Sequence, residues 1–174
     1  MNIIFTPISN PVSSSIKELY EQAFPPNERR PWNEQLTLIE TGRLLAETIS
    51  IDEAFTGFIF YWKLTDFVFI EHFSIADSNR GKGIGSKIIQ LLADRFHTIV
   101  LEAEPQETNA DAARRIQFYI RSGFELFKEP YEQPPYIPGG PCHAMQLMHL
   151  QMDSSKTTFS AVKNEIYGKV YGIK

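Results

Sequence analysis

The run Asn79–Ser86 places three glycines and two basic side chains within eight residues, Asn-Arg-Gly-Lys-Gly-Ile-Gly-Ser. The apolar and aromatic stretch 67–75 before it predicts a strand, and apolar residues spaced three or four apart after it predict a helix. Glycine lets a ligand approach the backbone closely, and the first N–H groups of a helix lack partners within that helix. Such a turn suits a phosphate, and Arg80 and Lys82 add full positive charge. The run therefore predicts a site for a phosphorylated ligand.

The spacing of these glycines separates the run from two common phosphate loops. No Gly-Lys-Ser or Gly-Lys-Thr closes it, as a P-loop requires, and its pattern G-x-G-x-G differs from the G-x-G-x-x-G of dinucleotide sites. The spacing Arg80-x-x-Gly83-x-Gly85 instead resembles the acetyl-coenzyme A pyrophosphate loop of the GCN5-related N-acetyltransferases. In that family the loop lies between the fourth strand and the third helix, which is the context predicted here.

Two further segments resemble the same family in the expected order. The helix predicted over 113–123 carries Phe118 and Tyr119, and Gly123 and Phe124 follow after three further residues, which resembles the F-Y-x-x-x-G-F ending of the family's late helix. Residues 24–32, Phe-Pro-Pro-Asn-Glu-Arg-Arg-Pro-Trp, match more loosely a segment between the first two helices of one branch. The resemblance covers roughly residues 1 to 150, and it implies an N-acetyltransferase that uses acetyl-coenzyme A as co-substrate.

Both the resemblance and the hydrophobic pattern predict the fold. The resemblance implies an α/β (α+β) fold with a mixed, mostly antiparallel central sheet of about seven strands, splayed between strands 4 and 5, with helices on both faces. The sequence pattern predicts strands over 3–8, 44–51, 55–64, 67–75, 97–104, 124–128 and 143–152. It predicts helices near 16–24, over 32–40, after the glycine run and up to Gly123, and a proline- and glycine-rich loop over 130–141.

We expect residues 1–152 to form one acetyltransferase domain, followed by a C-terminal extension over 153–174. In the extension, Phe159, Val162 and Ile166 follow a helical spacing, which predicts a short amphipathic helix. Packing of this helix on its own domain is favoured over docking on a second subunit. Members of the family often dimerise, so the resemblance is compatible with a homodimer, although no apolar stripe specifies an interface.

The resemblance assigns coenzyme binding to two neighbouring stretches. The backbone amides of Phe73, Ser74 and Ile75, on the fourth strand, are expected to hold the pantetheine arm and to polarise the acetyl carbonyl. The pyrophosphate is expected to contact the glycine loop, namely Arg80, Gly81, Lys82, Gly83, Ile84, Gly85 and Ser86. Asn109, at the start of the fourth helix, is expected either to hydrogen-bond the coenzyme arm or to cap that helix.

Acetyl transfer to an amine needs a base for the amine, a donor for the oxyanion and an acid for the leaving thiolate. The resemblance implies that Tyr119 is the acid, and the alternative is a core tyrosine. Glu71 is the candidate base, because it shares a strand face with Phe73. A carboxylate in so apolar a strand can equally be one partner of a structural ion pair. His72 is expected to point to the opposite face, as a structural histidine.

Other polar residues are candidates for the acceptor site. Glu102 and Glu104 share one face of the predicted fifth strand and could attract a cationic amine. Further candidates for its walls are Glu28, Arg29, Arg30, Trp32, Tyr131 and Tyr136. A covalent Cys-His mechanism is disfavoured, because Cys142 and His143 are adjacent and point to opposite faces of a strand. The four histidines show no ligand spacing, so no metal is expected.

Composition argues against several classes of function. The 174 residues, 43% hydrophobic and 22% charged, suit one domain with a core, and the formal net charge of −4 argues against bulk binding to nucleic acid or an anionic membrane. One cysteine excludes an internal disulfide framework, and neither a signal peptide nor an apolar run of membrane-spanning length is evident. We therefore expect a cytoplasmic protein.

The sequence thus favours direct attack on acetyl-coenzyme A, in a ternary complex, by the primary amine of a small molecule or peptide. Two alternatives stay open. The first is a catalytically inactive acyl-coenzyme A-binding sensor or interaction module, which would bind the coenzyme without acetyl transfer. The second is an acyltransferase that uses a longer acyl group.

Overall fold

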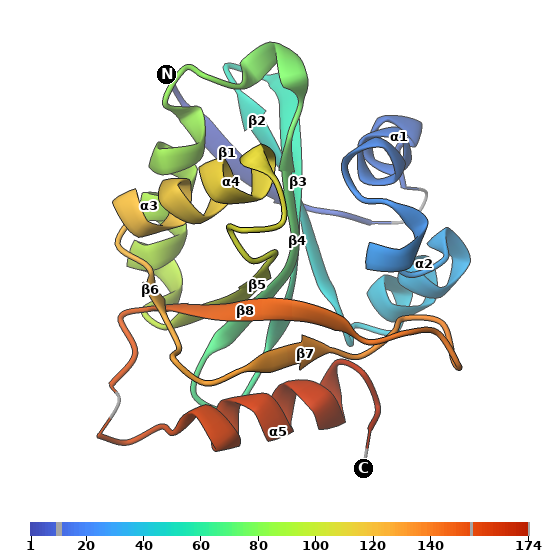
Figure 1. Cartoon of the computed structure of the whole chain (residues 1–174). Helices are drawn as coiled ribbons and strands as arrows, with labels where there is room; N and C mark the ends of the chain where they lie inside the picture. The colour runs from blue at the N-terminus through green and yellow to red at the C-terminus, as the bar shows by residue number, and fades with distance from the viewer. Residues whose placement is uncertain (10–11, 154, 174) are drawn as a thin grey trace. The chain divides into compact units, whose positions relative to one another are not determined.

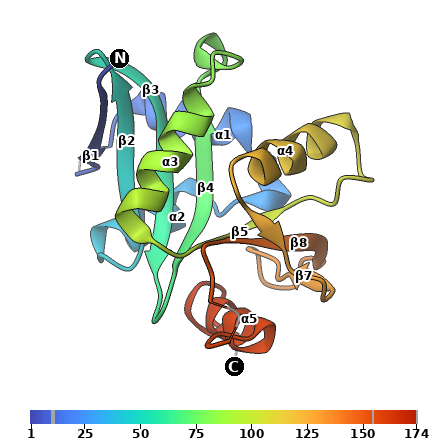
Figure 2. The ribbon, with the colours of Figure 1, turned by 90° about the vertical axis from the view of Figure 1, so that its left-hand side faces the viewer.

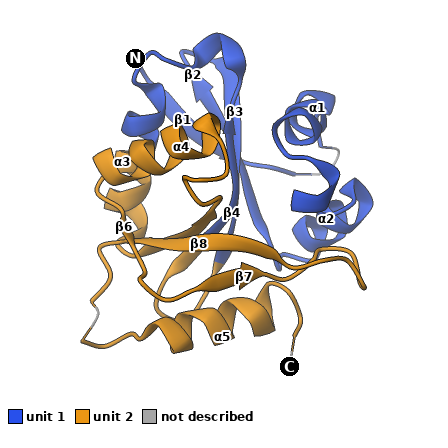
Figure 3. Ribbon diagram, in the orientation of Figure 1, with its two compact units in different colours: residues 1–62, 70–88 blue, residues 63–69, 89–174 orange. Residues whose placement is uncertain are grey.

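A computed structural model of the chain describes residues 1–9, 12–153 and 155–173 (Figure 1). In these ranges the chain forms eight β-strands, five α-helices and two 3₁₀-helices. They divide into two compact units (Figure 3), which comprise residues 1–62 with 70–88 and residues 63–69 with 89–174. Three elements contribute residues to both units: the strands β3 (Ala54–Lys63) and β4 (Val68–Ile75) and the helix α3 (Ile84–Phe96).

The first unit is built on a sheet in which β1, β2, β3 and β4 lie in that order (Figure 2). β1 (Ile3–Pro7) pairs antiparallel with β2 (Leu45–Ile51), which pairs antiparallel with β3 (Ala54–Lys63). The two loop residues between β2 and β3, Asp52 and Glu53, have positive φ angles of 47° and 70°. Such a two-residue turn matches the twist of the strands, and it fixes the register in which β2 meets β3.

Two helices, α1 (Ser14–Ala23) and α2 (Trp32–Glu40), lie on one side of this sheet, with the 3₁₀-turn η1 (Pro26–Glu28) between them (Figure 1). α1 buries Ile16, Leu19 and Tyr20, which are spaced to form one face of a helix. The Tyr20 ring packs against β3, with its centroid 5.7 Å from that of Phe60. Full burial of such side chains stabilises by about 1.5–3 kcal/mol each, so this face anchors the N-terminal helices to the sheet.

The second unit is arranged around a long strand, β8 (His143–Leu150). Three strands pair antiparallel with it: β5 (Ile99–Ala103), β6 (Glu125–Leu126) and β7 (Tyr131–Gln133). Figures 1 and 2 show α4 (Ala110–Arg121) and α5 (Phe159–Lys169) on opposite sides of β8. Each face of this group of strands is therefore covered by a different helix.

The predicted fold class is confirmed, because the chain has a mixed α/β fold with mostly antiparallel pairing. The helix predicted over 32–40 is α2, and Gly123 follows α4 with a φ of 93°, as its left-handed cap position predicts. One strand was missed: β7 interrupts the loop predicted over 130–141. It has only three residues, and the prolines on both sides of it hide the alternation of buried Tyr131 and Gln133.

The C-terminal residues form α5 and its flanks. α5 buries Val162 and Ile166 within the second unit, and Phe159 packs on Phe127 with ring centroids 5.4 Å apart. The boundary expected at residue 152 stays a prediction. Among the helices of the described ranges, none has the length and apolar character needed to cross a membrane.

Gly57 marks a close approach of the backbones of β3 and β4. A Cβ atom at this position would overlap the carbonyl oxygen of Ser74 and would lie 3.1 Å from Cα of Ile75. The amide of Ala76 also donates to the oxygen of Thr56, at 2.9 Å. A glycine inside a strand is the usual sign of such an approach. The end of β4 is therefore held tightly against β3.

We predict that Gly57→Ala lowers the free energy of unfolding by about 1–3 kcal/mol, because the added methyl group forces the two strands apart. Urea denaturation of both proteins measures this difference. Gly168→Ala is the matched control. Gly168 lies in α5, and the nearest atom to its Cβ position is 3.8 Å away, so alanine should raise stability by about 0.5–1 kcal/mol there. Unchanged stability of Gly57→Ala would contradict the close approach.

Candidate active site

The glycine loop has an open backbone at the start of α3. Gly81 and Gly83 have φ angles of 76° and 72°, and a Cβ atom at either position would meet nothing within 4 Å. The amide of Lys87 donates to the oxygen of Gly83 at 3.3 Å, at the beginning of the helix. In such a helix start the N–H groups of the first turn lack acceptors within the helix. The loop therefore has the backbone freedom and the donors that an anionic group needs.

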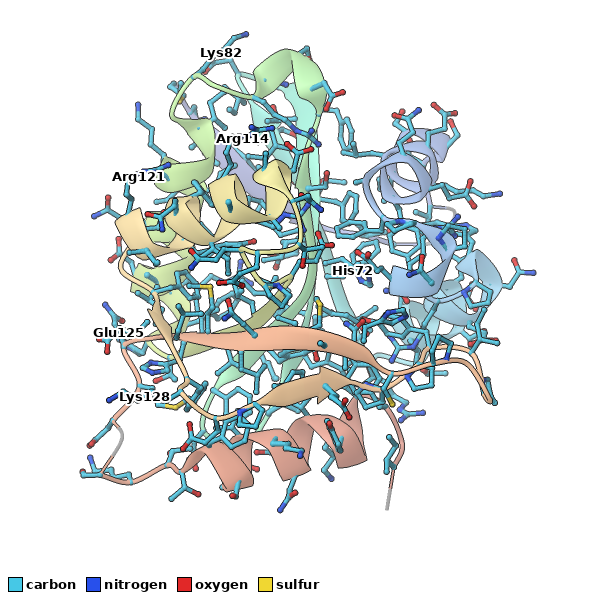
Figure 4. All side chains as sticks on the ribbon, in the orientation of Figure 1. His72, Lys82, Arg114, Arg121, Glu125 and Lys128 are labelled. Carbon is cyan, nitrogen blue, oxygen red and sulfur yellow. The ribbon has the colours of Figure 1, made fainter. Side chains whose placement is uncertain are left out.

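The two cations of the loop are held beside it. Arg80 forms an ion pair with Asp77 at 2.8 Å, and its Nε donates to the oxygen of Ile75 at 3.0 Å. Lys82, at the tip of the loop in Figure 4, donates to the oxygen of Ser78 at 2.8 Å. The side chains of Arg80 and Asp77 are 56% and 86% exposed. Exposed pairs of this kind are weak, so a phosphate can compete for these charges.

Glu71 lies in a buried polar network of the first unit. Its side chain is 0% exposed and accepts hydrogen bonds from the Arg30 guanidinium, from Trp62 Nε1 at 3.2 Å and from Gln35 Nε2 at 3.5 Å. Burial alone raises the pKa of this carboxyl, but the Arg30 charge, the neighbouring His72 and the hydrogen bonds from Arg30 and Trp62 together outweigh burial, and the pKa is lowered. These contacts are those of the structural ion pair that the sequence left open.

Strand alternation predicted that His72 points away from Glu71, but the two side chains lie close together. Nδ1 of His72 lies 3.8 Å from Oε2 of Glu71, because alternation fixes only the direction of the Cβ atoms and both side chains are long enough to meet. The ring lies between β4 and the helices α1 and α2 (Figure 4), at 5.0 Å from the Tyr20 ring and 4.5 Å from the Phe24 ring. Its Nε2 lies 3.2 Å from the oxygen of Glu28.

The surroundings of His72 keep its ring neutral. Burial lowers the pKa to about 4, although the Glu71 carboxylate acts in the opposite direction. A neutral ring with a proton on Nε2 donates to the Glu28 oxygen, so His72 ties η1 to β4. This arrangement supports the structural role expected for it.

Tyr119 and Asn109 belong to the second unit. Tyr119 is 9% exposed on α4, and its ring packs on Phe118 and Phe124 with centroids 5.1 and 5.3 Å away. Burial raises the pKa of its hydroxyl, so the phenol is protonated at neutral pH. The Oδ1 atom of Asn109 accepts from the amide of Ala112 at 2.8 Å, which makes Asn109 the N-cap of α4. Its contact with the coenzyme stays a prediction, as does the catalytic role of Tyr119.

Phe73, Ser74 and Ile75 occupy the end of β4 that Gly57 approaches. Ser74 is 5% exposed, whereas Phe73 and Ile75 are half-buried. Within the described residues, no three His, Cys, Asp or Glu side chains are grouped so that they could hold a metal ion.

A sequence model described as the Acetyltransferase (GNAT) family matches residues 13–124. The chain belongs to this family. The Bacillus subtilis (strain 168) protein YjbC, which is named as an acetyltransferase, is 31% identical to this GNAT chain over 75 residues. That match covers 42% of the chain and 39% of YjbC, so it spans about two fifths of this relative's length.

Solved structures agree with this assignment. A GNAT-family protein from Bacteroides thetaiotaomicron is 31% identical, with a TM-score of 0.89 over 98% of this chain and 99% of that protein. YncA from Salmonella typhimurium, solved with its cofactor acetyl-CoA, is 19% identical, with a TM-score of 0.59 over 88% of this chain and 95% of YncA. The second likeness is one of fold alone.

A second polar cluster of this GNAT protein, which we call the Glu102 cluster, lies in the second unit. The Glu102 carboxylate accepts hydrogen bonds from the Tyr131 hydroxyl, from Gln133 Nε2 and, at 2.8 Å, from the Tyr171 hydroxyl. Sequence reasoning had singled out Glu102 and Tyr131 separately, but it missed Gln133 and Tyr171. The alternation within β7 was the available signal for Gln133, whereas nothing local in the sequence points to Tyr171. Glu104 instead pairs with Arg115, at 3.2 Å.

We predict that the GNAT protein loses stability as pH falls from 6.5 to about 4, because of His72. Its pKa is lower in the folded chain, so the unfolded chain binds the extra proton in this interval and unfolding becomes easier. The slope from one such group approaches about 1.4 kcal/mol per pH unit. Glu71, with a lowered pKa, acts in the same direction at more acid pH.

The measurement is a series of urea denaturations between pH 4.5 and 7, compared with His72→Phe, which removes the titrating ring but keeps an aromatic side chain. The His72→Phe curve should be flatter in this interval. His97→Asn, which changes an exposed histidine with a positive φ angle of 59°, is the control and should keep the slope. Parallel curves for the wild type and His72→Phe would show that His72 does not carry the effect.

Proposed function

We propose that this GNAT protein transfers the acetyl group of acetyl-CoA to a primary amine of a small molecule or peptide, by direct attack. The observation that carries the proposal is the glycine loop. Its two left-handed glycines have open space where side chains would be, and it leads into the first turn of α3 with Arg80 and Lys82 beside it. This is the arrangement that a pyrophosphate needs.

The proposed roles of the other residues follow from their environments. The amides of Phe73, Ser74 and Ile75 would hold the pantetheine arm at a strand end that Gly57 keeps in place. Tyr119, which is protonated at neutral pH, would protonate the leaving thiolate. An N-cap geometry supports Asn109 in a structural role, so its contact with the coenzyme is the less supported proposal.

Glu71 is the weaker part of this proposal. With a lowered pKa and bonds to Arg30 and Trp62, its carboxylate has little tendency to take a proton from an amine. Its contacts support a role in ordering the segment around Arg30, and we propose that the amine loses its proton to solvent.

We predict that Gly83→Glu abolishes binding of acetyl-CoA and of free coenzyme A, because a carboxylate would occupy the proposed pyrophosphate position. Calorimetric titration of the purified chain measures both affinities. Gly42→Glu is the matched control, since Gly42 is also exposed, has a φ of 69° and has no atom within 4 Å of its Cβ position. It should bind the coenzyme like the wild type. Unchanged binding in Gly83→Glu would refute the loop assignment.

We predict that Tyr119→Phe lowers kcat at least about tenfold, with little change in the Kd for acetyl-CoA, because it removes the acid and keeps the ring. Release of free thiol in the presence of a panel of amines measures turnover. Equal turnover in the variant would remove Tyr119 from the chemistry. If the protein binds the coenzyme but no amine causes release of thiol, the protein is a sensor and not an enzyme. If thiol is released only when longer acyl-coenzymes are supplied, the donor is a longer acyl group and not acetyl.

A further inference from the structure

Glu102 lies on the face of the second unit that α5 covers. It stands opposite Leu147 of β8, and Tyr131 and Gln133 stand opposite Met145 and His143 of the same strand. Residues that pair across strands, or lie two apart along one strand, share a face. The donors to Glu102 thus come from β7 on that face and from Tyr171, which follows α5.

Gln133 leaves an acceptor without a partner in this cluster. The side chain is 4% exposed, and its Nε2 donates to the Glu102 carboxylate, which fixes the orientation of the amide since a carboxylate cannot bond the amide oxygen. The other atom, Oε1, is buried and has no hydrogen-bond partner. A buried acceptor of this kind is costly unless a donor reaches it. The site therefore lacks an N–H or O–H donor beside a carboxylate.

Four tyrosine rings form a chain of contacts beside Glu102. The Tyr171 ring lies 5.3 Å from the Tyr136 ring and 6.5 Å from the Tyr167 ring, and Tyr167 lies 5.8 Å from Tyr131. The ammonium group of Lys163 already lies over the Tyr167 ring, at 5.1 Å from its centroid. Faces of tyrosine rings attract cations, and a carboxylate among them strengthens the attraction.

We propose that the Glu102 cluster binds an ammonium group of the acceptor, and that the acceptors of this protein are amines carrying a second positive charge. The ammonium would donate to the Glu102 carboxylate and to Oε1 of Gln133, and the tyrosine rings would line its sides. Glu102 is half-buried, so a ligand can reach it, whereas Tyr131 and Gln133 are buried. The inference rests on the proposed function, because it names the class of substrate.

The test is calorimetric titration of the whole chain, saturated with coenzyme A, with 1,4-diaminobutane and with 4-amino-1-butanol. The two probes share one amine and differ in whether an ammonium or a hydroxyl group ends the chain. The wild type should bind the diamine roughly tenfold more tightly, as a charge-assisted hydrogen bond predicts. Equal affinities, or no binding of the diamine, would overturn the proposal without any variant.

Glu102→Gln should reduce this preference to about one, because it removes the charge and keeps the shape of the side chain. Glu104→Gln, on the same strand but paired with Arg115, is the matched control and should keep the preference. Coenzyme A affinity of each variant shows that it is folded. If Glu102→Gln does not fold, Gln133→Leu, which keeps the charge, should lower the preference about threefold. A preference that either folded variant leaves intact would overturn the proposal.

Thiol release separates this inference from the proposed function. If the protein acetylates amines without preference for the diamine, the proposed ammonium site is refuted and the proposed acetyltransferase function is supported. Binding of the diamine through Glu102 with no thiol release would support the Glu102 cluster as an ammonium site and refute the proposed function.

Discussion

The contact of one buried carboxylate with one guanidinium organises the N-terminal half of the molecule. Glu71 reaches from β4 to Arg30, and His72 beside it reaches to the oxygen of Glu28. The segment that joins α1 to α2 has few apolar residues of its own, so these polar contacts decide where it lies against the sheet. A buried pair of this kind adds little to stability by itself, since both charges lose their hydration. We infer that it favours one arrangement of the segment, because any other would leave a charge in an apolar place.

Glu71 and Glu102, the two glutamates at the centres of the polar clusters, differ in their hydrogen-bond partners. Glu71 is held by the Arg30 guanidinium and by the indole of Trp62, so its contacts are those of a structural residue. The hydrogen-bond partners of Glu102 include two phenols and an amide, and the same amide presents an unused oxygen. A buried acceptor without a hydrogen-bond donor, Oε1 of Gln133, therefore lies in the cluster around Glu102. Both stand on strands, which hold them more rigidly than loops would.

Features that depend on neighbouring residues were predictable from the sequence. The strand, glycine turn and helix around Gly83, the helix over Trp32–Glu40 and the left-handed Gly123 all follow from local spacing. The predictions that failed concern contacts that strand and helix patterns do not encode. β7 pairs with β8, whose partner residues lie 10 to 14 positions further along the chain, and the side chains of Glu71 and His72 meet although their Cβ atoms point to opposite faces. The close approach of the backbones at Gly57 was not predicted, although a lone glycine in an apolar strand can indicate one. The partners of Glu102 could not be foreseen, because no local pattern joins residue 102 to Tyr171.

The Glu102 cluster also has a consequence for the kinetics of folding. Its donors lie 29, 31 and 69 residues further along the chain than the carboxylate they share. Contacts so distant in sequence form only after the intervening segments have been ordered, since closing long loops costs entropy before any bond is gained. We therefore expect the bond from Tyr171, the most distant of the three donors in sequence, to form late in folding. Bonds that form after the transition state slow the escape from the native state and leave its formation nearly unaffected. We therefore expect the segment around Tyr171 to slow unfolding through its bond to Glu102 of β5, a residue 69 positions earlier in the chain.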